Sequence, residues 1–280
     1  MKVSRKSKGV LQVELDYHHG KMSPENFLLI SDIHWDHPDC QRDLLKGHLE
    51  EAKKIGAGIL VFGDLFDAMQ GKKDPRGRKS ELRPEFLGDA YFDKLVRQAA
   101  EYFNPYPIKL LARGNHELSV MSHNEIDLIE RLGYELGVAV MGYEGWVLFL
   151  AKRYTKEGKR VGWAKVKLHF THGSGGNSPV TKGVIQTARR AAYLPDANIS
   201  LSGHIHEGWQ FPVMRERISD KGNVYTDEQL HLQLPSYKGL DDEGISWERQ
   251  RGMAPKPLGG WWLTLKWFDD RYEWECRRAK

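Results

Sequence analysis

Five short polar segments, each placed directly after an apolar run, constrain the fold of this chain more than any other feature. The apolar runs have the length and composition of buried strands. In open α/β architectures, sites form beyond the carboxyl ends of strands, so we expect the five segments to converge on one spot. They are Ser31-Asp32-Ile33-His34, Gly63-Asp64-Leu65-Phe66-Asp67, Gly114-Asn115-His116-Glu117, Thr171-His172-Gly173 and Gly203-His204-Ile205-His206.

Strand-like and helical segments alternate in the first half of the chain, and β signals dominate after residue 207. The order fits two β-sheets packed on each other and flanked by helices. No linker is evident, so we predict a single domain over residues 1–280, with the part from about 207 to 280 completing the second sheet. The expected strands are 10–17, 27–31, 58–62, 108–112, 146–153, 161–171, 197–202, 210–218, 228–234 and 261–268, and the expected helices are 41–55, 86–103, 124–136 and 181–193.

The composition is that of a soluble globular protein, with 40% hydrophobic and 29% charged residues. No apolar run approaches the roughly 20 residues that span a bilayer. Residues 1–10 are basic and lack the apolar stretch of a secretory signal. Cys40 and Cys276 are expected to be free thiols in a reducing compartment. The sequence therefore predicts a cytoplasmic protein without a membrane partner, and it does not indicate an oligomeric state.

The five segments combine carboxylate, imidazole and amide side chains, which suit divalent ions such as Mn²⁺, Fe²⁺, Zn²⁺, Co²⁺ or Ni²⁺. Seven candidate ligands are too many for one tetrahedral ion but suit a pair, which a carboxylate such as Asp64 can bridge. Such a pair holds a phosphoryl group and activates water at neutral pH. The candidate ligands are Asp32, His34, Asp64, Asn115, His172, His204 and His206.

The spacing within two of the segments supports a shared centre. In extended backbone, residues i and i+2 point the same way, so Asp32 and His34 are expected to face one centre, as are His204 and His206. The glycines that precede Asp64, Asn115 and His204 permit tight turns. Each segment alone is common by chance, whereas all five in this order are not.

Together the segments resemble the signature of the calcineurin-like metallophosphoesterase superfamily, over the range from Asp32 to His206. The resemblance implies a four-layer α/β/β/α sandwich of two mixed β-sheets flanked by helices. It also implies two divalent ions, with Mn²⁺ favoured over Fe, Zn, Co or Ni, and a metal-bridging hydroxide as nucleophile. Asp32, His34 and His206 would hold the first ion and Asn115, His172 and His204 the second, with Asp64 bridging.

The resemblance assigns a different role to His116, which would not bind metal but would act as a general acid toward the leaving group. Asp67 would pair with this histidine and keep it protonated.

Three branches of the superfamily compete. Ala68 stands where Ser/Thr protein phosphatases carry the arginine that grips phosphate, which weighs against that branch. The motifs are more similar to bacterial phosphodiesterases and DNA-repair exonucleases, although only about 70 residues follow His206, too few for the C-terminal regions of the large nucleases. The third branch comprises phosphoesterases of nucleotides and other small molecules.

Basic residues suggest where a nucleic-acid backbone could bind. The segment Gly71 to Pro84 carries six basic and two acidic residues and is interpreted either as a solvated loop or as a phosphate contact. Tyr154, Trp163 and Trp209 could stack on bases, or lie in the core. The candidate substrate contacts are Lys72, Lys73, Arg76, Arg78, Arg113 and His37.

The sequence thus predicts a metal-dependent phosphoesterase, in first place a phosphodiesterase or nuclease acting on DNA or RNA. The alternative is a phosphomonoesterase or a phosphatase of nucleotides and small molecules. A protein phosphatase, or a binding module without turnover, is disfavoured because all seven ligand positions are filled and the phosphate-gripping arginine is absent.

Overall fold

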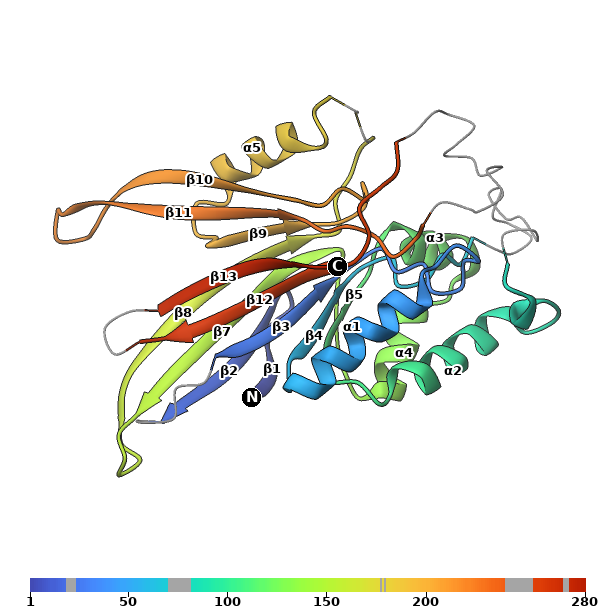
Figure 1. Ribbon diagram of the computed structural model, residues 1–280, viewed down its shortest axis with the longest axis horizontal. Coiled ribbons are helices and arrows are strands. Elements are labelled where there is room, and N and C mark those ends of the chain that lie inside the picture. The colour runs from blue at the N-terminus through green and yellow to red at the C-terminus, as the bar shows by residue number, and fades with distance from the viewer. Residues whose placement is uncertain (19–23, 70–81, 177, 179, 240–253, 269–271) are drawn as a thin grey trace.

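Two mixed β-sheets pack face to face in the computed structural model, and helices lie on their outer sides (Figure 1). The structure describes residues 1–18, 24–69, 82–176, 178, 180–239, 254–268 and 272–280. Helices α1 to α4 gather beside the six-stranded sheet, and α5 lies over the seven-stranded sheet (Figure 1). This arrangement confirms the expected four-layer α/β/β/α fold.

The six-stranded sheet has the order β13-β12-β3-β4-β5-β6. Strands β3 to β6 are parallel, whereas β12 runs antiparallel to both β3 and β13. Its strands are β3 (Glu25–Ile30), β4 (Gly58–Phe62), β5 (Ile108–Ala112), β6 (Ala139–Met141), β12 (Gly260–Trp267) and β13 (Tyr272–Ala279).

The seven-stranded sheet has the order β1-β2-β7-β8-β9-β11-β10. Strand β9 lies parallel to both β8 and β11. Its strands are β1 (Lys2–Ser7), β2 (Val10–His18), β7 (Glu144–Tyr154), β8 (Arg160–Thr171), β9 (Ile199–Ser202), β10 (Trp209–Ile218) and β11 (Val224–Gln233).

The helices follow the strands that carry the polar segments. They are α1 (Arg42–Ile55), α2 (Tyr91–Phe103), α3 (Asn115–Asn124), α4 (Leu128–Leu136) and α5 (Val184–Tyr193), together with a 3₁₀ turn, η2 (Pro84–Phe86). No helix in the described ranges is both long and apolar enough to cross a membrane.

Two apolar layers hold the fold together. Phe27 of β3, Phe149 of β7 and Phe170 of β8 belong to the layer between the two sheets. Leu49 of α1 and Phe103 of α2 belong to the layer between the six-stranded sheet and its helices. Strands β3 to β5 contribute to both layers, which explains why they are apolar on both faces and appear in the sequence as continuous apolar runs.

Several element boundaries differ from the sequence-based expectation. The helix expected from residue 86 begins at Tyr91, because Gly88 and Ala90 have φ values of 97° and 57° and interrupt the helical backbone. The helix expected over 124–136 begins at Leu128, and a separate helix, α3, precedes it. Strands β1, β6 and β13 were not predicted. Cys40 and Cys276 are free thiols, as expected.

Candidate metal centre

The five polar segments follow the carboxyl ends of five strands, and the structure brings them together. Asp32 follows β3, Asp64 follows β4 and Asn115 follows β5 in the six-stranded sheet. His172 follows β8 and His204 follows β9 in the seven-stranded sheet. Because β3, β4 and β5 run parallel, as do β8 and β9, their carboxyl ends lie at one edge of the two packed sheets.

The backbone at these segments is not extended, so one sequence-based argument was wrong. Asp32 and His34 have φ values of 50° and 48°, and His204 and His206 have values of 71° and 54°. Asp64 has a φ of 47°. The side chains therefore converge through left-handed turns rather than through strand alternation. Non-glycine residues in this region cost about 1–3 kcal/mol each, a strain that is typical of functional sites.

The first cluster of candidate ligands contains Asp32, His34 and His206, whose donor atoms lie within 4.8 Å of one another. The Nε2 atoms of His34 and His206 are 3.3 Å apart, and His206 Nε2 lies 3.3 Å from Asp32 Oδ1. On its other side, His34 Nδ1 lies 2.9 Å from Asp67 Oδ1. A carboxylate there favours a proton on Nδ1, which leaves the Nε2 lone pair free to bind a metal.

The second cluster contains Asp64, His172 and His204, again within 4.8 Å of one another. His172 Nδ1 donates to the carbonyl of Phe62 at 3.0 Å, so its Nε2 is the ring nitrogen that faces Asp64 Oδ2 and Asn115 Oδ1, both at 3.0 Å. His204 Nδ1 lies 2.7 Å from the same Asn115 oxygen. All seven predicted ligands thus occupy one continuous group of donors.

The electrostatics of this group fit bound cations. Asp32 and Asp64 are buried, at 0% and 1% exposure, and burying two neighbouring carboxylates requires compensating positive charge. Without metal, histidine must supply that charge. Burial disfavours the protonated form of His172, but the neighbouring carboxylates of Asp64 and Asp32 raise its pKa to about 10. Burial opposes the ionised form of Asp32 too, but His172 and His206 lower its pKa to about 2. Two divalent ions would replace these protons.

Two other buried carboxylates hold the loop after β4, and sequence reasoning did not single them out. Glu117 accepts backbone hydrogen bonds from Asp64, Phe66 and Gly114 at 2.8–3.0 Å. Burial and the neighbouring Asp64 raise the pKa of Glu117 to about 7. The sequence signal for this role was its position as the third residue of a helix, where a Glu side chain reaches back to the helix start.

Asp36 supports the same loop from the other side. It accepts from the backbone N–H groups of Asp67 and Ala68 at 2.6 and 2.9 Å, and from the Tyr91 hydroxyl at 2.6 Å. No sequence pattern distinguished it from an ordinary loop aspartate.

The predicted pairing of Asp67 with His116 takes an unexpected form. His116 Nδ1 donates to the backbone carbonyl of Asp67 at 2.6 Å, whereas the Asp67 carboxylate lies 3.9 Å from that nitrogen. The carboxylate is closer to His34. His116 Nε2 lies 3.8 Å from Asp64 Oδ2, so this ring borders the candidate ligands. Burial disfavours its cation, but Asp64 and Asp67 raise the pKa of His116.

Lys238 is a further residue that the sequence did not indicate. Its Nζ lies 3.6 Å from Asp67 Oδ1, and its side chain is 14% exposed. The preceding residues anchor it, because the Ser236 hydroxyl and the Tyr237 N–H both donate to the carbonyl of Asp32, at 2.7 and 3.0 Å. The segment lies in a long connection without periodicity, so no pattern could place it.

The predicted substrate contacts have mixed outcomes. Arg113 donates to Asp127, Glu130 and the carbonyl of Met141 at 2.6–3.0 Å, so these contacts do not support a substrate role. His37 is buried near the centre, and its Nδ1 accepts from the Asp39 N–H at 3.1 Å. Lys72, Lys73, Arg76 and Arg78 lie outside the described residues.

The three aromatic residues considered for base stacking lie on or next to the seven-stranded sheet. Trp163 is 58% exposed, and Lys165 Nζ lies over its ring, 4.7 Å from the centroid. Tyr154 stacks on His18, with ring centroids 5.3 Å apart. Trp209 donates from its indole to the carbonyl of Lys182 at 2.9 Å. None of the three lies in the core, and base stacking stays a prediction.

Comparisons with known proteins agree with this geometry. A family model described as calcineurin-like phosphoesterase matches residues 25–208, the range that holds all five polar segments. A search of curated proteins found no match.

Similar solved structures include a predicted phosphoesterase from Streptococcus pneumoniae, at 13% identity and a TM-score of 0.32, with 92% of each chain covered. Vacuolar Protein Sorting 29 from Cryptosporidium parvum has 13% identity and a TM-score of 0.34, covering 91% of this chain and 97% of that one. GAP50, the anchor in the inner membrane complex of Plasmodium, has 12% identity and a TM-score of 0.42, covering 92% and 85%.

Proposed function

We propose that this chain, which belongs to the calcineurin-like phosphoesterase family, hydrolyses phosphoric ester bonds with two divalent metal ions. The observation that carries the proposal is the position of Asp64 between two clusters of buried donors. It forms one group with His34 and His116 and another with His172 and His204, each with donor atoms within 4.8 Å, and His34 also belongs to the cluster with Asp32 and His206. A carboxylate between two such groups is the arrangement that a bridged metal pair requires.

The residues divide between the two ions as follows. Asp32, His34 and His206 would hold one, and Asn115, His172 and His204 the other, with Asp64 shared. When bound, the ions would polarise the phosphoryl group and activate water as the nucleophile. We propose Mn²⁺ as the ion used, because carboxylate, imidazole and amide donors suit it.

His116 would supply the proton for the leaving group. Its Nδ1–H is committed to the Asp67 carbonyl, so Nε2 is the atom that borders the centre. Transfer of a proton from Nε2 to the departing oxygen would be general acid catalysis. Asp67 then acts on both histidines, through its carbonyl on His116 and through its carboxylate on His34.

For the substrate we propose a phosphodiester, in first place DNA or RNA, cleaved in the cytoplasm. The segments that contain Asp64 and His204 resemble those of phosphodiesterases, and Ala68, which is only 1% exposed and stands where protein phosphatases have their arginine, weighs against a protein phosphatase. The formal net charge of +4 is compatible with a polyanionic substrate. A phosphomonoesterase of nucleotides or other small molecules is the alternative.

The deciding experiment compares hydrolysis rates with Mn²⁺ on a chromogenic phosphodiester, the matching phosphomonoester, and labelled single- and double-stranded DNA and RNA. Faster cleavage of the diester together with nucleic-acid degradation would support the proposal. Monoester preference with intact nucleic acid would replace it with the alternative. Metal binding without turnover of any ester would indicate a binding module.

Substitutions at the centre test the assignment of roles. Asp64→Asn and His206→Ala should lose metal, measured by elemental analysis, and lose turnover with it. His116→Gln should keep its metal content and lose about 10²–10⁴-fold in kcat, the usual contribution of a general acid. Loss of metal from His116→Gln would show that this histidine is a ligand instead.

A further inference from the structure

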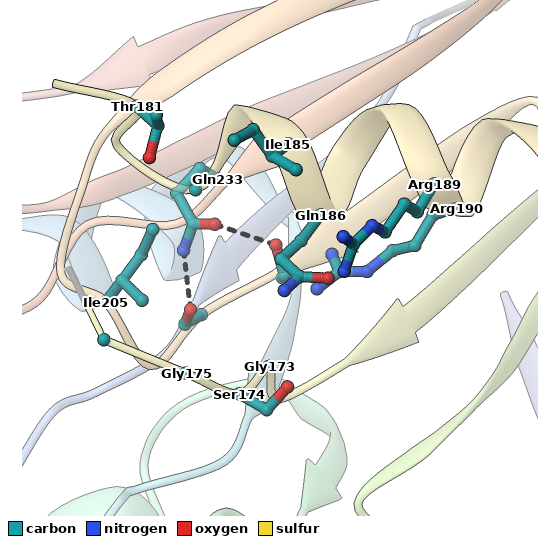
Figure 2. A pocket seen from close by; sticks show the side chains of 14 residues that line it. Gly173, Ser174, Gly175, Thr181, Ile185, Gln186, Arg189, Arg190, Ile205 and Gln233 are labelled. Atoms are coloured by element: carbon teal, nitrogen blue, oxygen red, sulfur yellow. Dashed lines mark hydrogen bonds between the residues drawn. The ribbon is translucent and has the colours of Figure 1, made fainter. Parts of the chain in front are cut away.

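A second polar pocket lies beside the metal centre, between helix α5 and the loops that carry His172 and His204 (Figure 2). Its volume is about 200 Å³. We call it the α5 pocket and define it by Gly173, Gly183, Gln186, Arg189, Arg190 and Gly203, which line it with their neighbours. Gly173 directly follows the candidate ligand His172, and Gly203 directly precedes His204, so the pocket shares two loops with the metal centre.

The charge of the pocket is positive. Arg189 and Arg190 both line it, and among the described lining residues there is no aspartate or glutamate. In Figure 2 both arginine side chains extend from α5 on the side of Gln186. The first turn of α5 also contributes to the lining and contains no acidic residue. The N-terminal end of a helix attracts anions through its free N–H groups and its dipole.

Arg190 makes the strongest case for a ligand, because it is buried at 9% exposure. Within the described ranges, no carboxylate lies within 4.0 Å of its guanidinium; its side chain hydrogen-bonds with Tyr193, and Glu144 and Tyr143 act on it electrostatically. The histidines that it influences, His169 and His231, are buried too. An arginine stays charged in proteins, and a buried charge without a close counter-ion is costly. An anion in the pocket would relieve this cost.

The rest of the lining consists of satisfied polar groups and glycines, which is compatible with a bound anion. At the base, Gln233 is 3% exposed and donates to the carbonyl of Gly203 at 2.6 Å, while it accepts from the Ser202 hydroxyl at 2.8 Å. These bonds satisfy the buried amide and give the Gly203 carbonyl a donor within the protein. Glycines at 173, 175 and 176 expose backbone on the opposite wall. Close backbone approach to phosphate is a common use of glycine.

We propose that the α5 pocket binds a phosphate group, held by Arg189 and Arg190 in the second half of α5. The phosphate could belong to the substrate, as a group next to the scissile one, or it could be free in solution. Arg190 suits either source, because its planar fork matches phosphate oxygens. Binding itself does not depend on the proposed hydrolysis; only the assignment to the substrate rests on the proposed function.

The first arm of the test measures binding. Inorganic phosphate is titrated by calorimetry into the full-length, Mn²⁺-loaded protein, its Arg190→Gln variant, and the matched control Arg97→Gln, which removes the same charge from an exposed position on α2. The wild type and Arg97→Gln should bind one phosphate more per chain than Arg190→Gln. Equal stoichiometry and affinity in all three proteins would overturn the proposal. If Arg190→Gln does not fold, as judged by circular dichroism, Arg189→Gln replaces it and should weaken the same binding at least threefold.

The second arm distinguishes the two sources. Hydrolysis of a diester with a single phosphate is compared with that of a dinucleotide that also carries a terminal phosphate. If the substrate supplies the phosphate, Arg190→Gln should raise KM at least tenfold for the dinucleotide and leave the single-phosphate diester unchanged. If both substrates behave alike while the first arm shows the lost phosphate, the pocket binds free phosphate. Absence of all turnover would contradict the proposed function and leave the binding result standing.

Discussion

At the scale of the residue, the buried carboxylates near the centre differ in what they face, as Asp32, Asp64, Glu117 and Asp36 show. Asp32 and Asp64 face histidine ring nitrogens, as metal ligands do, and each also accepts a backbone N–H. Glu117 and Asp36 face backbone N–H groups, and so they fix the loop after β4 rather than bind an ion. The chemistry of the four side chains is the same, and only their partners separate the two roles.

The role of Glu117 leads to a prediction for Glu117→Gln. The carboxylate accepts three backbone N–H groups, whereas a glutamine has one acceptor oxygen and would turn an NH₂ toward at least one of these donors. We expect the free energy of unfolding to fall by about 1–3 kcal/mol, the cost of an unsatisfied buried donor. Because Asp64 is held by one of these bonds, the affinity for Mn²⁺ should fall as well.

Chemical denaturation and metal titration would measure both effects. Glu101→Gln is the matched control, because it makes the same change at an exposed position of α2 and should leave both quantities unchanged. A Glu117→Gln variant as stable as the wild type would show that the three hydrogen bonds are not important for the loop.

At the scale of the element, the strands that precede the candidate ligands were predicted from the sequence, whereas the left-handed turns that orient the ligand side chains were not. Strands β3, β4 and β5 are buried on both faces, so their apolar runs were visible without tertiary information. The positions of the candidate ligands followed, because each comes directly after such a strand. The left-handed backbone of Asp32, His34 and His204 was not predictable, since a positive φ is uncommon for any non-glycine residue, even though Asp and His adopt it more often than most.

Other elements were missed for a related reason. Helix α3 begins at Asn115, inside a segment that was interpreted only as a ligand motif. Among the described strands, β13 pairs with β12 alone, and its burial alternates along a segment with several charged residues. Lys238 reaches Asp67 from a connection with no periodicity. In each case a distant partner determines the structure, and local pattern carries little of that information.

The turn after β4 gives a prediction at this scale for Gly63→Ala. Gly63 has a φ of 95°, and a Cβ there would lie 2.5 Å from His172 Nδ1 and 2.8 Å from Gly114 Cα. The strained backbone alone costs about 1–2 kcal/mol, and the clash must also displace two ligand-bearing loops. We expect Gly63→Ala to lose both stability and metal occupancy.

Gly56→Ala separates the two contributions. Gly56 has a φ of 69° at the end of α1, but nothing lies within 4 Å of a Cβ built there. This control should be destabilised by about 1–2 kcal/mol in thermal or chemical unfolding and should bind metal normally. Normal metal binding in Gly63→Ala would mean that the loops around the centre can rearrange without loss.

At the scale of the whole molecule, the centre depends on the last part of the chain as well as on the family motifs. Strand β12 pairs with β3, the strand that leads to Asp32, with Trp261 opposite Leu29. Ser236 and Tyr237 bind the Asp32 carbonyl, and Trp261 donates from its indole to the carbonyl of Gln233 at 3.1 Å. The residues after 208 lie beyond the range of the family match. Their contacts with β3 and with the Asp32 backbone therefore help to position the first cluster.

The buried histidines of the seven-stranded sheet make stability sensitive to acid. Burial, together with Arg190 and Arg215, lowers the pKa of His231 to about 4. Burial and Arg190 lower the pKa of His169 to about 4 as well. Below pH 6.5 the unfolded chain takes up protons at these positions while the folded chain does not. Their contribution to stability is therefore fully present above pH 6.5 and is lost as the pH falls toward 4.

His231→Gln tests this dependence. His231 is 1% exposed and its Nε2 lies 2.9 Å from Gln229 Oε1, a contact that a glutamine amide could replace. A shift from 6.5 to about 4 corresponds to a loss on the order of 3 kcal/mol for this residue between those pH values. Urea unfolding at a series of pH values should show a shallower decline in His231→Gln than in the wild type, whereas exposed His18, changed to Gln, should leave the slope unchanged. Metal ligands that titrate in this range contribute equally to all three proteins, so the difference in slope isolates His231. Parallel curves for His231→Gln and the wild type would mean that this histidine is protonated equally in the folded and unfolded chains, and that acid acts on the fold elsewhere.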